Sequence, residues 1–256
     1  MLSSLIASLH AELLRSGHTN GAEVGEDMFP LIFAVFGVFV AHWEDWVELV
    51  QYLQQANKPE YQEGCAILCA PRQIYGSCRM LTPKPELLND LREAGAILEI
   101  GVSYSRCRLS FINERVLSWL CDYGAWLELY LYAKIRQSGL TDDVMLDAVL
   151  SWDNDADDDD TVNEVDVLAL RGNRLYLFSC KAGAVNTADL NELAVLAHRF
   201  GGGGGILATA ATRASLSHAF VMRAESMGVT LLTREDLMEP RIDEQLKCIF
   251  GESKAV

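Results

Sequence analysis

The sequence lacks the excess of positive charge with which a protein grips nucleic acid over a broad surface. It carries 21 lysines and arginines against 36 aspartates and glutamates, a formal net charge of −15 at pH 7. Because each phosphate contact requires a basic side chain, this balance argues against a broad polyphosphate-binding surface. It does not exclude a nucleic-acid enzyme, since a divalent metal held by carboxylates is itself a strong local cation in a phosphate site.

Long hydrophobic runs and paired cysteine motifs are also missing. The most apolar stretch, residues 29–41, is interrupted by Pro30 and Gly37 and is shorter than the roughly 20 residues that a membrane-spanning helix needs. The seven cysteines include no CxxC pair, which is typical of reduced thiols. We therefore predict a cytoplasmic protein without a membrane partner. Ordinary packing is favoured over structural zinc for the nearest cysteine cluster, Cys65, Cys69 and Cys78.

The composition that remains is that of a globular protein, with 50% hydrophobic and 22% charged residues. We divide it into a region 1–112 of open role and a larger region 113–256. The first is predicted to contain an amphipathic helix at 2–14, a buried apolar stretch at 29–41, helices at 43–55 and 83–94, and strands at 97–102 and 107–111. Helix followed by two strands is winged-helix-like over 83–112, although a small α/β spacer is the favoured alternative.

The second region alternates strands and helices in a recognisable order. We predict a helix at 114–137, strands at 147–152, 162–170 and 174–180, a helix at 187–200, a flexible glycine turn at 201–205, a strand at 206–210, a helix at 213–227, a strand at 229–232 and a closing helix from 234. The second and third strands meet at a tight Gly172-Asn173 turn, and two crossover strands follow. This order predicts an α/β fold with a mixed sheet flanked by helices, preceded by the smaller α/β region.

Two charged residues, Asp166 and Lys181, lie in or at the end of predicted apolar strands, where burying a charge is energetically unfavourable. Asp166 interrupts an apolar strand, where a carboxylate needs a metal or hydrogen bonds to compensate its burial. Lys181 ends the adjacent strand, so the hairpin brings both side chains to one end of the sheet. A carboxylate that holds Mg²⁺ or Mn²⁺ beside a lysine that orients water or neutralises developing charge is what phosphodiester hydrolysis requires. Either residue alone is more often an ordinary surface charge at a strand end.

Three segments carry a family resemblance: 124–128 (Gly-Ala-Trp-Leu-Glu), 163–168 (Asn-Glu-Val-Asp-Val-Leu) and 179–181 (Ser-Cys-Lys). With the glycine-rich turn, they resemble the PD-(D/E)xK superfamily, and more closely the nuclease half of CRISPR ancillary nucleases fused to a CARF sensor of cyclic oligonucleotides. The resemblance covers about residues 97–237 and implies a restriction-endonuclease-like fold. It also implies an endonuclease that acts in defence against foreign DNA or RNA.

By this resemblance, Glu128 and Asp166 are metal ligands, the carbonyl of Cys180 adds an oxygen, and Lys181 acts on the attacking water. The pattern departs from the family at Ser179, where an acidic residue is expected two positions before the lysine. A hydroxyl is a poorer, neutral metal ligand, so the activity is expected to be weakened unless Glu164 or Glu128 substitutes. The resemblance further implies a homodimer, with a cyclic oligonucleotide activator only where a sensor is present. Candidate phosphate contacts flank the glycine run at Arg199, Arg213 and Arg223.

Other interpretations stay open at this stage. A catalytically weakened relative would act as a nucleic-acid-binding or regulatory subunit, and an interaction module without nucleic acid would account best for the acidity. Asp153, Asp155, Asp157 and Glu164 match EF-hand positions 1, 3, 5 and 12, but Asp158 occupies the position of the required glycine. A solvated acidic loop is therefore favoured over a calcium site.

Overall fold

The computed structural model describes residues 24–76, 79–151 and 162–251. The helix predicted at 2–14, Cys78 and the acidic run from Asp153 lie outside these residues. The described chain forms two compact units, the first spanning Glu26–Trp126 and the second beginning at Leu127. The domain boundary predicted between residues 112 and 113 stays a prediction.

The first unit packs helices against a small antiparallel sheet. Its helices are α2 (Phe29–Ala41), α3 (Trp43–Ala56), α4 (Pro85–Glu93) and α5 (Glu114–Leu120), with short 3-10 turns at Glu26–Met28 and Pro59–Tyr61. Its strands are β1 (Gln62–Glu63), β2 (Ala66–Cys69), β5 (Ile97–Val102) and β6 (Cys107–Phe111), in the sheet order β1-β2-β6-β5, and a separate hairpin of β3 (Gln73–Tyr75) and β4 (Arg79–Leu81). The predicted order of one helix and two strands is thus present as α4, β5 and β6.

The apolar stretch 29–41 forms the core helix α2 of this unit. Ile32, Val35 and Phe39 are fully buried along it. The Phe39 ring meets the ring of Trp46 edge to face at a centroid distance of 5.1 Å, a geometry that aromatic pairs favour. No single helix of the described chain is long and apolar enough to span a membrane, although the strongly bent pair 26–41 and 43–56 passes the length and composition criteria together.

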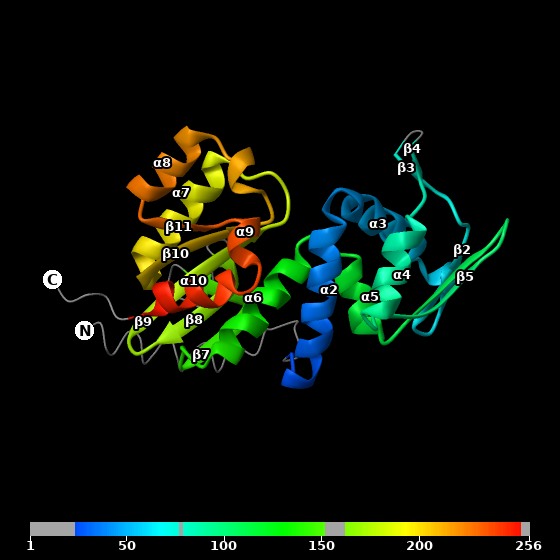
Figure 1. Cartoon of the computed structure of the whole chain (residues 1–256), viewed down its shortest axis with the longest axis horizontal. Coiled ribbons are helices and arrows are strands. Elements are labelled where there is room, and N and C mark those ends of the chain that lie inside the picture. The colour runs from blue at the N-terminus through cyan, green and yellow to red at the C-terminus, as the bar shows by residue number, and fades with distance from the viewer. Residues whose placement is uncertain (1–23, 77–78, 152–161, 252–256) are drawn as a thin grey trace. The chain divides into compact units, whose positions relative to one another are not determined.

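The second unit is built on a five-stranded mixed sheet with helices on both faces (Figure 1). The strands lie in the order β11-β10-β9-β8-β7, antiparallel from β7 to β9 and parallel from β9 to β11. The elements are α6 (Ala125–Ser138), β7 (Asp143–Ser151), β8 (Val162–Arg171), β9 (Arg174–Lys181), α7 (Thr187–Leu196), a π-helical turn (Ala197–Gly201), β10 (Gly202–Thr209), a 3-10 turn (Arg213–Ser215), α8 (His218–Ser226), β11 (Val229–Leu232), α9 (Arg234–Leu237) and α10 (Arg241–Phe250). The predicted α/β class with a mixed sheet flanked by helices is confirmed.

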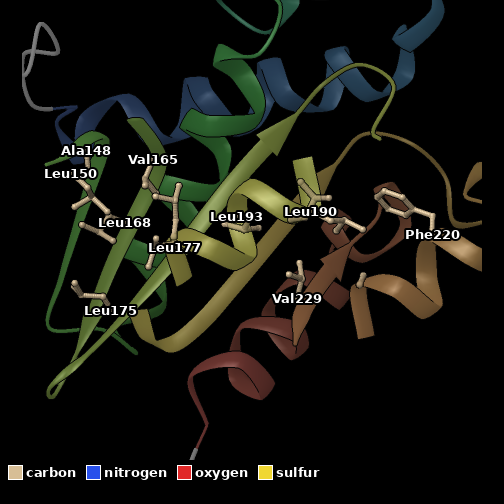
Figure 2. Close-up of a cluster of buried hydrophobic side chains, with 13 residues drawn as sticks. Ala148, Leu150, Val165, Leu168, Leu175, Leu177, Leu190, Leu193, Phe220 and Val229 are labelled. Carbon is tan, nitrogen blue, oxygen red and sulfur yellow. The ribbon is translucent and has the colours of Figure 1, made fainter. Parts of the chain in front are cut away.

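The two faces of the sheet have separate hydrophobic cores. On one face, Leu175 and Leu177 of β9 pack with Leu190 and Leu193 of α7 and with side chains of α8 (Figure 2). On the other face, the ring of Phe250 in α10 contacts the ring of Tyr176 at 4.9 Å between centroids. Because side chains alternate along a strand, α7 covers the face to which Ser179 and Lys181 belong.

Several predicted boundaries need correction. The helix predicted over 114–137 is two helices, because the Asp122 carboxylate accepts the backbone N–H groups of Gly124 and Ala125 and caps a new start. The segment predicted as one helix over 213–227 is a 3-10 turn followed by α8, whose first turn is capped by the Ser217 hydroxyl. The closing helix divides into α9 and α10, and Pro240 stands immediately before the second of them.

The glycine run is also not the flexible turn that was predicted. Residues 202–205 belong to β10 and pair in parallel with β9, with Gly202 opposite Leu175 and Gly205 opposite Leu177. An ideal Cβ at Gly205 would lie only 3.0 Å from Cγ of Leu193 in α7. Glycine here lets α7 approach the sheet closely.

Candidate active site

Asp166 and Ser179 face each other at one end of the β8–β9 pair. Val167 pairs with Phe178, so the next residues outward are Asp166 and Ser179. The Cys180 backbone N–H donates a hydrogen bond to Oδ2 of Asp166 at 2.5 Å, and the Ser179 hydroxyl donates to the same oxygen at 3.4 Å. The carboxylate is thereby held in a fixed orientation by β9.

A pocket opens beside this carboxylate. Val165, Phe178, Leu193 and Leu196 form its apolar lining, and its polar residues are Glu164, Asp166, Ser179, Lys181, Asp189 and Glu192. Four of these six carry carboxylates and only Lys181 carries a positive charge. An anionic phosphodiester would be repelled from such a pocket unless a cation entered with it.

The pKa of Asp166 reflects this environment. Burial raises its pKa above the usual value, and the charge of Glu164 acts in the same direction. The Cys180 N–H, the Lys181 ammonium and the Ser179 hydroxyl lower it but do not reverse the shift. A bound cation would favour the ionised carboxylate and relieve this cost.

The side chain of Cys180 does not line the pocket. Its thiol is buried, and burial raises its pKa well above the usual range, with the negative charges of Asp166, Glu128 and Asp147 adding to the effect. This environment disfavours the thiolate form, and Cys180 meets the site through its backbone N–H. Glu128 on α6 lies near this thiol, but it is not among the described residues that line the pocket.

None of the three predicted phosphate-binding arginines lines the pocket. The Arg199 guanidinium stacks on Phe200 at 5.9 Å from the ring centroid. Arg213 donates its backbone N–H to Glu235, and Arg223 on α8 donates to the side chain of Asn191 at 3.3 Å. Among the described residues that line the pocket, none is an arginine. Their phosphate-binding role stays a prediction.

The donor chemistry of the pocket fits a hard divalent cation. Carboxylate oxygens are ligands that Mg²⁺ and Mn²⁺ prefer, and the pocket offers four carboxylates. Within the described ranges, no three histidine, cysteine, aspartate or glutamate side chains are already gathered closely enough to hold a metal ion. The ligand set would therefore have to draw together on binding.

Two pocket carboxylates, Asp189 and Glu192, were not predicted as site residues. The spacing 189, 192, 193, 196 puts these residues on one face of a helix. This spacing identifies them as site residues only when it is known which face of the sheet the helix covers.

Comparisons with known proteins agree with this arrangement. A family model for the endonuclease domain of Card1-like proteins matches residues 118–251, more than half of the chain. Among solved structures, protein VC1899 from Vibrio cholerae superposes with a TM-score of 0.60 at 19% identity, over 87% of this chain and 58% of that one. Can2 from Sulfobacillus thermosulfidooxidans, solved in complex with cyclic tetra-adenylate, superposes with a TM-score of 0.53 at 16% identity, over 86% of this chain and 57% of that one.

These structural matches show the fold, and the chain spans just under three fifths of the length of either protein. A search among curated proteins gives no match. The resemblance stated from the three sequence segments is confirmed.

Proposed function

We propose a function for this chain, which belongs to the Card1-like endonuclease family: it is a metal-dependent nuclease that hydrolyses phosphodiester bonds of DNA, RNA or both. The observation that carries this proposal is the meeting of Asp166 and Lys181 in one pocket at the end of the β8–β9 hairpin. A carboxylate for a cation and a lysine for the scissile phosphate are the two groups that the reaction needs.

The residues of the chain divide the work between them. Asp166 is the fixed ligand, because the Cys180 N–H holds one of its oxygens, and the Cys180 carbonyl is a second oxygen donor. Lys181 donates hydrogen bonds to the attacking water or to a phosphate oxygen as negative charge develops there. When bound, Mg²⁺ or Mn²⁺ supplies Lewis-acid polarisation of the phosphate and makes water a stronger nucleophile.

The wider setting of this activity is part of the same proposal. We place the protein in the cytoplasm, in defence against foreign nucleic acid, and as a homodimer. The Can2 structure contains cyclic tetra-adenylate, and an activator of that class is proposed here only for an arrangement in which a sensor is present. Glu128 is kept as a candidate ligand from α6, while Arg199, Arg213 and Arg223 are kept as candidate phosphate contacts.

The test is cleavage of supercoiled plasmid, single-stranded DNA and RNA with Mg²⁺ or Mn²⁺. Lys181→Ala and Asp166→Asn should each lower the rate by at least about a hundredfold, since each removes a group that acts on transition-state charge. Lys247→Ala, which removes an exposed lysine of α10, is the matched control and should cut like the wild type. Cleavage that is metal-independent, or that survives both site variants, would contradict the proposal.

A second candidate function is favoured by one observation. The position of the expected acid is held by Ser179, whose hydroxyl is hydrogen-bonded to Asp166. A non-catalytic relative would use the pocket to bind nucleic acid or to regulate a partner. Fluorescence anisotropy with labelled oligonucleotides separates the two candidates, because the second predicts binding without turnover in either metal. If the protein is instead an interaction module that does not use nucleic acid, we expect neither oligonucleotide binding nor cleavage.

A further inference from the structure

We propose that Glu192 of α7 supplies the carboxylate ligand that Ser179 does not. The metal would then be held by Asp166, Glu192 and the Cys180 carbonyl, with Lys181 beside them. This inference rests on the proposed function and assigns a specific residue to its metal site.

The helical spacing of α7 directs Glu192 toward the pocket. Residues 189, 192, 193 and 196 follow the i, i+3, i+4, i+7 pattern of a single helix face, and all four line the pocket. Leu193 and Leu196 continue this face into the hydrophobic core. This face of α7 therefore carries apolar side chains, Leu193 and Leu196, where it packs on the sheet, and acidic ones, Asp189 and Glu192, beside the pocket.

The packing of Leu193 sets the height of Glu192 above β9. Leu193 contacts Gly205, where even a Cβ would be 3.0 Å from its Cγ, and Gly205 is the β10 partner of Leu177. Ser179 is two residues further along β9, about 6.6 Å at the usual strand rise. Helical side chains lean toward the N-terminus of their helix, and α7 begins on the Lys181 side because only residues 182–186 separate it from β9. The long side chain of Glu192 therefore leans toward Ser179.

The other pocket carboxylates are less suited to replace the missing acid. Asp189 accepts the backbone N–H of Asn186 at 2.7 Å and belongs to the capping box that starts α7, so recruiting it would weaken the helix start. Glu164 lies on β8, the same strand as Asp166. Glu192 reaches the site from the helix that covers Ser179 and has no capping task in the helix.

The pocket carboxylates carry like charges, which a bound divalent ion would neutralise. Glu192 is exposed and has three side-chain torsions, so it can swing inward when a divalent ion neutralises the pocket. In this proposal, binding of the ion brings Glu192 into the ligand set.

The experiment measures Mn²⁺ affinity of the full chain by titration calorimetry and by the EPR signal of free Mn²⁺. Glu192→Gln should weaken Mn²⁺ binding by at least about tenfold, as expected when a metal site loses a supporting oxygen. Adding Ser179→Glu to Glu192→Gln should restore the affinity, because the acid returns to its family position. Glu225→Gln, an exposed glutamate of α8, is the matched control, and Glu164→Gln tests the competing carboxylate.

The outcomes separate this inference from the function it rests on. Wild-type protein that binds no Mn²⁺ overturns both. Wild-type binding that depends on Asp166 but is unchanged in Glu192→Gln, or that is lost in Glu164→Gln instead, overturns only the role of Glu192. Weakened binding in Glu192→Gln with rescue by Ser179→Glu supports it, and plasmid or RNA cleavage by the same variants should follow the same order.

Discussion

Replacing Gly205 by alanine should destabilise the second unit through one steric contact. The new methyl carbon would lie 3.0 Å from Cγ of Leu193 and 3.2 Å from Cβ of Ala197. Carbon atoms pack best at about 3.5 to 4.0 Å. The added methyl group therefore forces α7 or the Leu193 side chain outward by several tenths of an ångström.

The magnitude follows from two opposing terms. Overpacking of a close-packed core costs about 1 to 3 kcal/mol, and alanine restricts the unfolded chain, which returns about 0.4 to 1 kcal/mol. The backbone at Gly205 is not in the left-handed region, so strain adds nothing. The two terms together leave about 0 to 2.6 kcal/mol, and we expect a net loss near the middle of this span, about 1 to 2 kcal/mol in the free energy of unfolding.

Urea denaturation followed by circular dichroism measures this loss, and a double-mutant cycle identifies its source. Leu193→Ala removes the Cγ atom that the new methyl would strike, so in that background Gly205→Ala should cost at least about 1 kcal/mol less. Gly37→Ala in α2, where nothing lies within 4 Å of the added carbon, should be neutral or stabilising by up to about 1 kcal/mol. An additive cycle, or wild-type stability in Gly205→Ala, would refute the steric argument.

Three further changes test other contacts. Tyr130→Phe removes the buried hydroxyl that donates to the Leu237 carbonyl at 2.6 Å and should cost about 1 to 3 kcal/mol; an unchanged melting temperature would contradict it. Burial raises the pKa of Asp166 above its unfolded value, so its ionisation weakens the metal-free fold as pH rises through the unfolded and then the folded pKa. Asp166→Asn should therefore be more stable than wild type at neutral pH without metal, and denaturation in acid should show this advantage disappearing. Burial raises the pKa of the Cys180 thiol, so iodoacetamide at pH 8 should label the exposed Cys248 and leave Cys180 unlabelled in mass spectra of the folded protein.

The sheet could be predicted from sequence because its strands carry strong local signals. The apolar runs of β8 and β9 and the Gly172-Asn173 turn between them define a hairpin without reference to any other element. This hairpin alone places Asp166 near Lys181. The central pair of the candidate site was accordingly available before the structure.

Features that depend on packing between elements were not available. The glycine run has low strand propensity and reads as a turn, yet tertiary packing makes it part of β10, because a residue without a side chain is needed under Leu193. The break between α5 and α6 depends on Asp122 acting as a cap. In the sequence, Asp122 is indistinguishable from a solvated helical residue.

The proposed role of Glu192 illustrates why motif spacing is an incomplete guide to a metal site. The chemistry requires an oxygen at a point in space, and any element that passes that point can provide it. In this fold the pocket is lined by β8, which carries Asp166, by β9, which offers Ser179, and by α7, which brings Asp189 and Glu192. A loss at Ser179 is therefore evidence against activity only if α7 brings no carboxylate, and the pocket contains two from that helix. Ser179 should accordingly be judged together with Glu192, because a substitution on the strand and a carboxylate on the helix can leave the charge of the pocket unchanged.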